Sequence, residues 1–167
     1  SPDKLIIGQW VLESIQIENL DQVCSAQSEV LLSQIDAQIS LLDNEIAQQS
    51  DDSEIQKRNA RKEELQLQRV NFLPDNIKKA LEVNNKQQIG NLVIAFNQDS
   101  TFIFTAPEVE DCLGNWSITN NILSTTQKGK NTENSTLVSI TSNKLDLLSS
   151  DYLGEIEIKT HMSFNKK

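Results

Sequence analysis

The sequence predicts a mainly β protein: an eight-stranded antiparallel up-and-down barrel with a long helical hairpin inserted between strands 1 and 2. Between residues 26 and 88 apolar residues recur at helical spacing, whereas from Gly90 onward they alternate with polar residues, as in strands that bury one face. The later strands are joined by short polar connections, which is typical of a meander, and closing eight strands into a barrel removes both sheet edges. Residues 1–167 are therefore predicted to form one domain, with residues 26–88 as an insertion.

The first predicted element is a strand over residues 4–18, where β-branched residues are frequent and apolar and polar residues alternate in the second half. A polar segment follows and contains Ser25 and Ser28, two candidate N-cap residues whose hydroxyl oxygens can accept hydrogen bonds from the free N–H groups at the start of a helix. Strand 1 is therefore predicted to lead directly into the insertion.

The inserted helices are predicted over residues 26–49, over residues 53–71 and from Asp75 onward. The polar run at residues 50–53 separates the first two and can cap the second, and Pro74 stops or kinks that second helix. The apolar stripe of the first helix consists of five residues spaced by three and four: Leu32, Ile35, Ile39, Leu42 and Ile46. Because the second helix has few apolar residues, we expect the tip of the first to be partly exposed or covered by a partner.

Seven further strands are predicted after Gly90, at residues 91–96, 101–105, 112–119, 122–126, 136–140, 144–149 and 155–164. Asn120 and Asn121 are suited to a type I′ turn between two of them, and residues 127–135 are interpreted as a polar loop. In the last strand one face consists of Ile156, Ile158, Met162 and Phe164. Similar apolar faces in the other strands are expected to converge on one interior.

Several of these segments resemble the strands of bacterial lipocalin-like domains. "IIGQWVLESI" carries Gly8 and Trp10, like the glycine and tryptophan that open the barrel in this family. "IAFNQDSTFIFT" resembles the hairpin in which an Asp-Gly-Thr turn lies between two phenylalanines, with Ser100 in place of the turn glycine. "LGNWSITNNILSTT", with Gly114 and Trp116, resembles the next hairpin, and "SNKLDLLSS" resembles the one after it. The resemblance covers about 100 residues, all in the strands.

The resemblance implies a small closed or half-open barrel with an apolar interior, of a kind common in exported and surface-anchored proteins of gut-type Bacteroidetes. The candidate interior residues for ligand binding are Trp10, Phe96, Phe102, Phe104, Trp116 and Met162. The two tryptophans either plug the barrel floor or line a cavity, and the sequence leaves open whether the interior is filled. An open cavity would suit a lipid-like or aromatic molecule.

Two functional hypotheses follow from this fold. The first is a non-enzymatic, lipocalin-like binding protein, exported to the periplasm or the outer surface as a mature form or lipoprotein, that holds a small apolar ligand in the barrel. The second is a protein-interaction module, in which the barrel is a packed scaffold and the helical hairpin binds a second copy of the chain or another protein.

The two cysteines, Cys24 and Cys112, are 88 positions apart and lack the spacing of a metal site. They are either two free thiols or a single disulfide. A disulfide would tie the hairpin to the barrel and would require an oxidising compartment.

Other classes of function are disfavoured by composition. A net charge of -9 disfavours nucleic acid and anionic membranes as partners, because both require a basic face. The single histidine, His161, lies on the outward face of the last strand without a positioned nucleophile, so no catalytic residue, metal site or cofactor is predicted. No apolar run approaches the roughly 18 residues needed to cross a bilayer.

Overall fold

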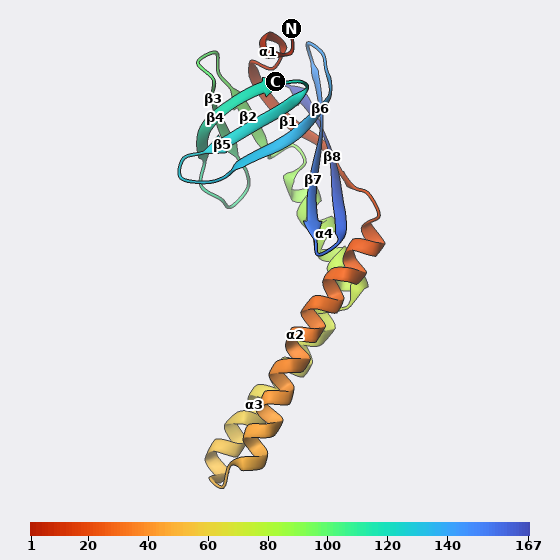
Figure 1. Cartoon of the computed structure of the whole chain (residues 1–167), viewed down its shortest axis with the longest axis vertical. Helices are drawn as coiled ribbons and strands as arrows, with labels where there is room; N and C mark the ends of the chain where they lie inside the picture. Colours follow the sequence, from red (N-terminus) through yellow and green to blue (C-terminus); the bar gives the residue numbers. More distant parts are fainter. The chain divides into compact units, whose positions relative to one another are not determined.

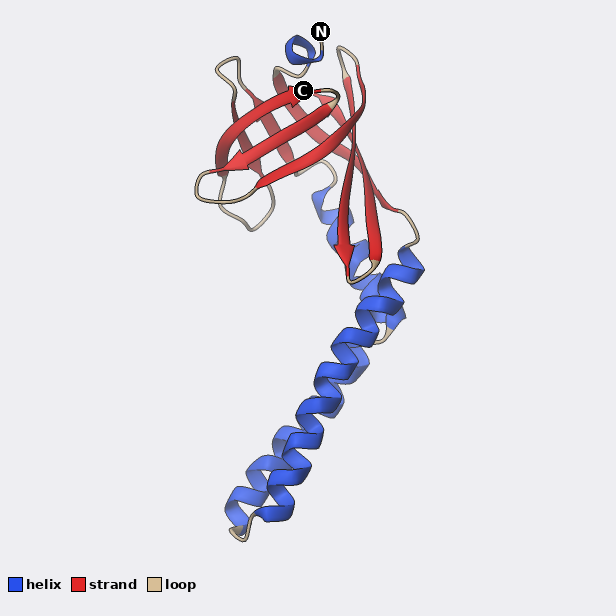
Figure 2. Ribbon diagram, viewed as in Figure 1, coloured by secondary structure: helices blue, strands red, loops and turns tan.

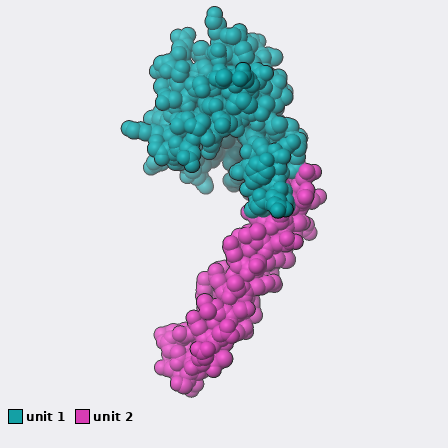
Figure 3. Space-filling view, in the orientation of Figure 1, with its two compact units in different colours: residues 1–18, 83–167 teal, residues 19–82 magenta.

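The computed structural model describes residues 1–167 and divides into two compact units (Figure 3). One unit comprises residues 1–18 and 83–167 and contains all the strands; the other comprises residues 19–82 and is helical (Figure 2). The helical unit follows strand 1 in the chain and precedes strand 2, as predicted.

The eight strands form a closed antiparallel barrel in which each strand pairs with the next, and the last pairs with the first (Figure 1). The strands are β1 (Gly8–Ile17), β2 (Val93–Phe96), β3 (Thr101–Thr105), β4 (Cys112–Thr119), β5 (Ile122–Gln127), β6 (Thr132–Ile140), β7 (Lys144–Leu153) and β8 (Ile156–Lys166). This confirms the predicted fold class. Asn120 and Asn121 both have positive φ angles, of 52° and 61°, as a type I′ turn between β4 and β5 requires.

The prediction of a strand over residues 4–18 is wrong at its start. Residues Pro2–Leu5 form a short helix, α1, in which proline occupies the first turn, where its missing N–H costs no hydrogen bond. Gly8 then has a φ of +130°, a value that L side chains rarely adopt. This glycine lets the chain leave α1 and enter β1.

The helical segment comprises α2 (Leu20–Gln48), α3 (Asp52–Arg69), the 3₁₀ turn η1 (Val70–Phe72) and α4 (Pro74–Gln88). The helix α2 begins before the predicted residue 26, because Asn19 adopts a left-handed conformation and turns the chain straight into the helix. Ser25 and Ser28 therefore lie inside α2 and cap nothing; the Ser28 hydroxyl donates to the Phe72 carbonyl oxygen at 2.6 Å. The predicted cap before α3 is confirmed, since the Asp51 carboxylate accepts from the backbone N–H of Ser53.

The interpretation of residues 127–135 as a loop is also wrong, because β6 begins at Thr132. Polar pairs across the two strands accompany this extension: Ser124 bonds Asn134 at 2.6 Å, and the hydroxyl oxygens of Thr126 and Thr132 lie 2.7 Å apart. Only a short turn remains between β5 and β6.

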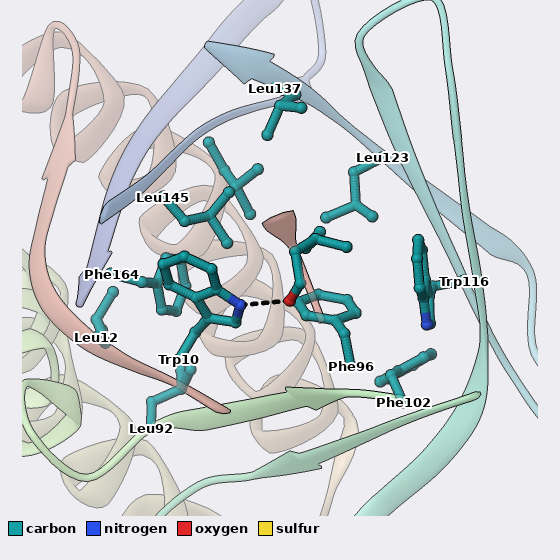
Figure 4. Packing of buried hydrophobic residues seen from close by; sticks show 12 residues of the cluster. Trp10, Leu12, Leu92, Phe96, Phe102, Trp116, Leu123, Leu137, Leu145 and Phe164 are labelled. Atoms are coloured by element: carbon teal, nitrogen blue, oxygen red, sulfur yellow. Dashed lines mark hydrogen bonds between the residues drawn. The ribbon is translucent and has the colours of Figure 1, made fainter. Parts of the chain in front are cut away.

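The core of the barrel unit is a cluster of buried apolar side chains (Figure 4). At one end of it, Ile6 and Trp10 are fully buried, and the indole N–H of Trp10 donates to the Ile6 carbonyl oxygen at 2.6 Å. The Lys166 ammonium donates to the Leu5 carbonyl oxygen at 3.1 Å and lies 5.1 Å from the centre of the Trp10 ring. The segment after α1 therefore packs into the barrel and fills part of its interior.

Candidate ligand-binding site

The remaining part of the barrel interior encloses a cavity of about 340 Å³. This volume lies near the lower end of the range for small-molecule sites. Its apolar lining comes mainly from β2, β3 and β8 and comprises Leu92, Ile94, Phe96, Phe102, Phe104, Leu123, Leu147, Met162 and Phe164. The lining is therefore mostly apolar, as a site for a small apolar molecule requires.

A second part of the lining is polar and comes from β5, β6 and β7: Thr125, Gln127, Glu133, Ser135 and Ser149. The strand register sets these residues beside one another, because Glu133 pairs with Thr125, and Ser135 pairs with Ser149. The hydroxyl oxygens of Ser135 and Ser149 lie 3.0 Å apart and are hydrogen-bonded. The cavity thus has an apolar wall and a polar wall.

Polarity also changes with depth along the strands of the polar wall. On β6 the inward positions run from exposed Glu133 through half-buried Ser135 to buried Leu137. On β5 they run from half-buried Gln127 and Thr125 to buried Leu123. The polar groups therefore lie toward the mouth of the cavity, and the leucines lie toward the core.

Three aromatic side chains, from β2, β3 and β4, pack together in the core of the barrel (Figure 4). The Phe96 ring lies 5.7 Å from the Trp116 ring, edge to face, and 6.4 Å from the Phe102 ring. The Trp116 indole N–H donates to the Asn97 carbonyl oxygen at 3.2 Å, which fixes its orientation. Gly114, opposite Phe102 in the register, leaves room for the Phe102 ring.

The structure brings together four of the six predicted interior residues in the cavity wall: Phe96, Phe102, Phe104 and Met162. Trp10 and Trp116 are buried core residues and are not among the lining residues, so they fill the barrel interior. The five polar lining residues were not predicted. The predicted loop over residues 127–135 includes Gln127, Glu133 and Ser135, and Thr125 and Ser149 lack the apolar character that marks inward positions.

The predicted stripe on α2 faces α3 within the helical unit. Ile35 is buried, while Leu32, Ile39, Leu42 and Ile46 are half-buried. Three ion pairs join the two helices: Asp36 with Arg69 at 2.9 Å, Asp43 with Lys62 at 2.6 Å, and Glu45 with Arg58 at 3.1 Å. The stripe is therefore covered in part by α3, and charged contacts supplement the sparse apolar ones.

Apolar side chains nevertheless remain exposed on the helical unit. Leu41 is 60% exposed and Leu67 is 75% exposed. Val70 and Leu73 are also exposed, and both line a shallow depression whose other lining residues are Asp36, Ile39, Gln66 and Arg69. Exposed apolar side chains of this kind are the candidates for contact with a partner through the hairpin.

The outer face of β7, β8 and the end of β1 carries two polar contacts. His161 Nε2 lies 2.7 Å from a Glu18 oxygen, and this hydrogen bond lowers the pKa of Glu18. Asp146 accepts hydrogen bonds from the hydroxyl groups of Ser139 and Ser163, which lower its pKa. Neither serine hydroxyl is hydrogen-bonded to His161.

Cys24 and Cys112 are free thiols, which is one of the two states that the sequence left open. Cys24 is buried in the helical unit, and burial raises its pKa. Cys112 opens β4 in the barrel unit. The disulfide, which was the other state that the sequence left open, is therefore not formed.

Comparison with protein-family models, with curated proteins and with solved structures gives no match. None of the helices combines the length and the apolar character needed to span a bilayer. No group of three or more His, Cys, Asp or Glu side chains is placed to hold a metal ion.

Proposed function

We propose that this protein is a lipocalin-like binding protein that holds a small, largely apolar ligand in the open part of its barrel. The observation that carries this proposal is the cavity of about 340 Å³ lined by Ile94, Phe104 and Met162 on one side. A cavity of this volume falls within the range of small-molecule sites, so it has room for an alkyl chain or a small aromatic molecule. The expectations of export and of a non-enzymatic role accompany this proposal and rest on the sequence.

Binding of a neutral fluorescent probe, N-phenyl-1-naphthylamine, tests the proposal on the full chain. We expect saturable binding to the wild-type protein and at least a tenfold loss of affinity in Ser149→Phe, because position 149 lines the cavity and a phenyl ring would fill it. The matched control is Ser150→Phe, since residue 150 is exposed and adjacent side chains of a strand point to opposite faces. Equal affinity in both variants, or no saturable binding to the wild type, would contradict the proposal.

A second candidate function is protein interaction through the helical unit, favoured by the exposed Leu41 and Leu67. Sedimentation velocity of the full chain at high micromolar concentration tests self-association. We expect dimers that are lost in the double variant L41Q/L67Q and kept in Leu113→Gln, which alters a comparably exposed leucine on β4. A wild-type protein that stays monomeric would contradict self-association through Leu41 and Leu67.

A further inference from the structure

We infer that the ligand of the barrel is an amphiphile whose polar head carries an amine, with the head at the mouth beside Glu133 and the apolar body against Ile94, Phe104 and Met162. This inference rests on the proposed function and specifies the chemical class of ligand. It is carried by the division of one cavity into an apolar wall and a polar wall.

The apolar wall can accommodate only the body of such a ligand. Ile94 and Phe104 are paired neighbours on β2 and β3, and Met162 projects from β8. None of these side chains can bind a charged or strongly hydrated group, since burying such a group without a hydrogen-bond partner is costly. A ligand with polar groups at both ends would therefore lose free energy on entering the cavity.

The polar wall offers acceptors for a head group. Glu133 is the only charged residue among those that line the cavity. Its carboxylate forms no ion pair or side-chain hydrogen bond with another residue of the protein, and the same holds for the side chains of Thr125 and Gln127. By contrast, Ser135 and Ser149 are hydrogen-bonded to each other. An amine entering the mouth therefore meets a carboxylate that has no other partner.

The nearest cations in the sequence are Lys128 and Lys130, in the turn between β5 and β6. Both are absent from the cavity lining, and neither is paired with Glu133. The whole chain is acidic, with a net charge of -9, which also favours a cationic over an anionic ligand at a distance. The negative charge of Glu133 in the cavity lining and the negative net charge of the chain therefore both favour a cationic ligand.

Decylamine, decanol and decanoate test the inference, because they share one chain and differ in the head group. Their dissociation constants are measured at pH 7 by displacement of N-phenyl-1-naphthylamine from the full-length wild-type protein. An exposed ion pair is worth up to about fivefold in affinity, and a like-charge contact costs a similar factor. We therefore expect decylamine to bind about tenfold more tightly than decanoate, with decanol between them.

The variant Glu133→Gln separates the local carboxylate from the charge of the whole chain. It is expected to bring the affinities of the three compounds to within about threefold, while Glu157→Gln, which removes the same charge from the outer face of β8, leaves the wild-type order unchanged. Circular dichroism and the unfolding midpoint confirm that both variants are folded. Preserved preference for decylamine in Glu133→Gln would overturn the assignment to this residue.

The outcomes also distinguish the inference from the proposed function. Equal affinities for the three compounds, or tightest binding of decanoate, would overturn the inference and leave the barrel as a ligand-binding site. Failure of the probe and all three compounds to bind would overturn both.

Discussion

Gly114 shows how one residue can determine the packing of the barrel wall. A Cβ atom at this position would lie 2.2 Å from the Thr126 carbonyl oxygen and 2.7 Å from an edge carbon of the Phe102 ring. The first contact is with backbone and cannot be relieved by a side-chain rotation. Glycine is therefore required for the close approach of β4 to β5 and for the position of Phe102 at the base of the cavity.

We predict that Gly114→Ala lowers the free energy of unfolding by about 2–3 kcal/mol, because the added methyl group forces β4 and β5 apart and displaces the Phe102 ring. Urea unfolding followed by tryptophan fluorescence measures the change. Asn115→Ala is the control, since Asn115 is the exposed neighbour on the same strand. A loss in Gly114→Ala no larger than in the control would show that the strands can adjust freely.

Asp146 links the stability of the barrel to pH. Hydrogen bonds from Ser139 and then Ser163 lower its pKa below the ordinary value of 3.8, so the folded state holds the proton less tightly than the unfolded state. Its contribution is therefore fully present above the unfolded pKa and is lost as the pH falls through the lower folded pKa. Since the Asp146 carboxylate is partly exposed, we expect its contribution to the free energy of unfolding to be about 1 kcal/mol.

Asp146→Asn should accordingly have a free energy of unfolding about 1 kcal/mol lower than that of the wild type at pH 7, and this difference should shrink as the pH falls below 3.8. Urea unfolding at a series of pH values measures the difference. Asp111→Asn, in the polar loop before β4, removes a carboxylate that has no side-chain partner and should show no such dependence. A difference between wild type and Asp146→Asn that stays constant with pH would contradict the assigned cause.

The start of α3 allows a prediction for a single helix. The Asp51 carboxylate accepts hydrogen bonds from the N–H groups of Ser53 and Glu54, at 2.9 and 3.4 Å, and offsets the positive end of the helix dipole. Asp51→Ala should lower the free energy of unfolding by about 1 kcal/mol. It should also lower the midpoint of thermal unfolding followed by circular dichroism at 222 nm. Ser50→Ala, whose side chain makes no hydrogen bond, should leave that midpoint unchanged.

Elements with one apolar face could be predicted from the sequence, and elements without one could not. The alternation in β3 and β8 and the three-four spacing in α2 indicated both element type and inward residues. The start of β6 is polar on both faces, because one face is exposed and the other lines the cavity mouth. Without apolar alternation, residues 132–135 resembled a loop, and Glu133 was missed for the same reason.

The helix boundary at Leu20 was missed for a different reason. The turn before α2 depends on a left-handed Asn19, and no side-chain capping bond accompanies it. Ser25 and Ser28 had suitable chemistry for capping but lie within the helix. The side-chain chemistry of Ser25 and Ser28 indicated a helix start near residue 26. The left-handed backbone conformation of Asn19 instead starts the helix at Leu20.

For the whole chain, closure of the barrel followed from strand number and from the lengths of β1 and β8, whereas the cavity did not. Whether an interior is filled depends on the summed volumes of side chains from all eight strands, which no local pattern reports. Ile6 illustrates this point, since a residue before β1 enters the core beside Trp10. Which part of the interior is filled by side chains such as Ile6 and Trp10, and which part stays open as the cavity, is thus determined only by the assembled barrel.

Met162, the only methionine of the chain, allows a direct test of whether the ligand occupies the barrel interior. With a ¹³C-labelled methionine methyl group, the protein gives one methyl signal from a residue that lines the cavity. We predict that this signal shifts as decylamine is added and saturates at the same concentration as displacement of the fluorescent probe. Saturation of the probe displacement with an unmoved Met162 signal would place the ligand elsewhere and contradict the account.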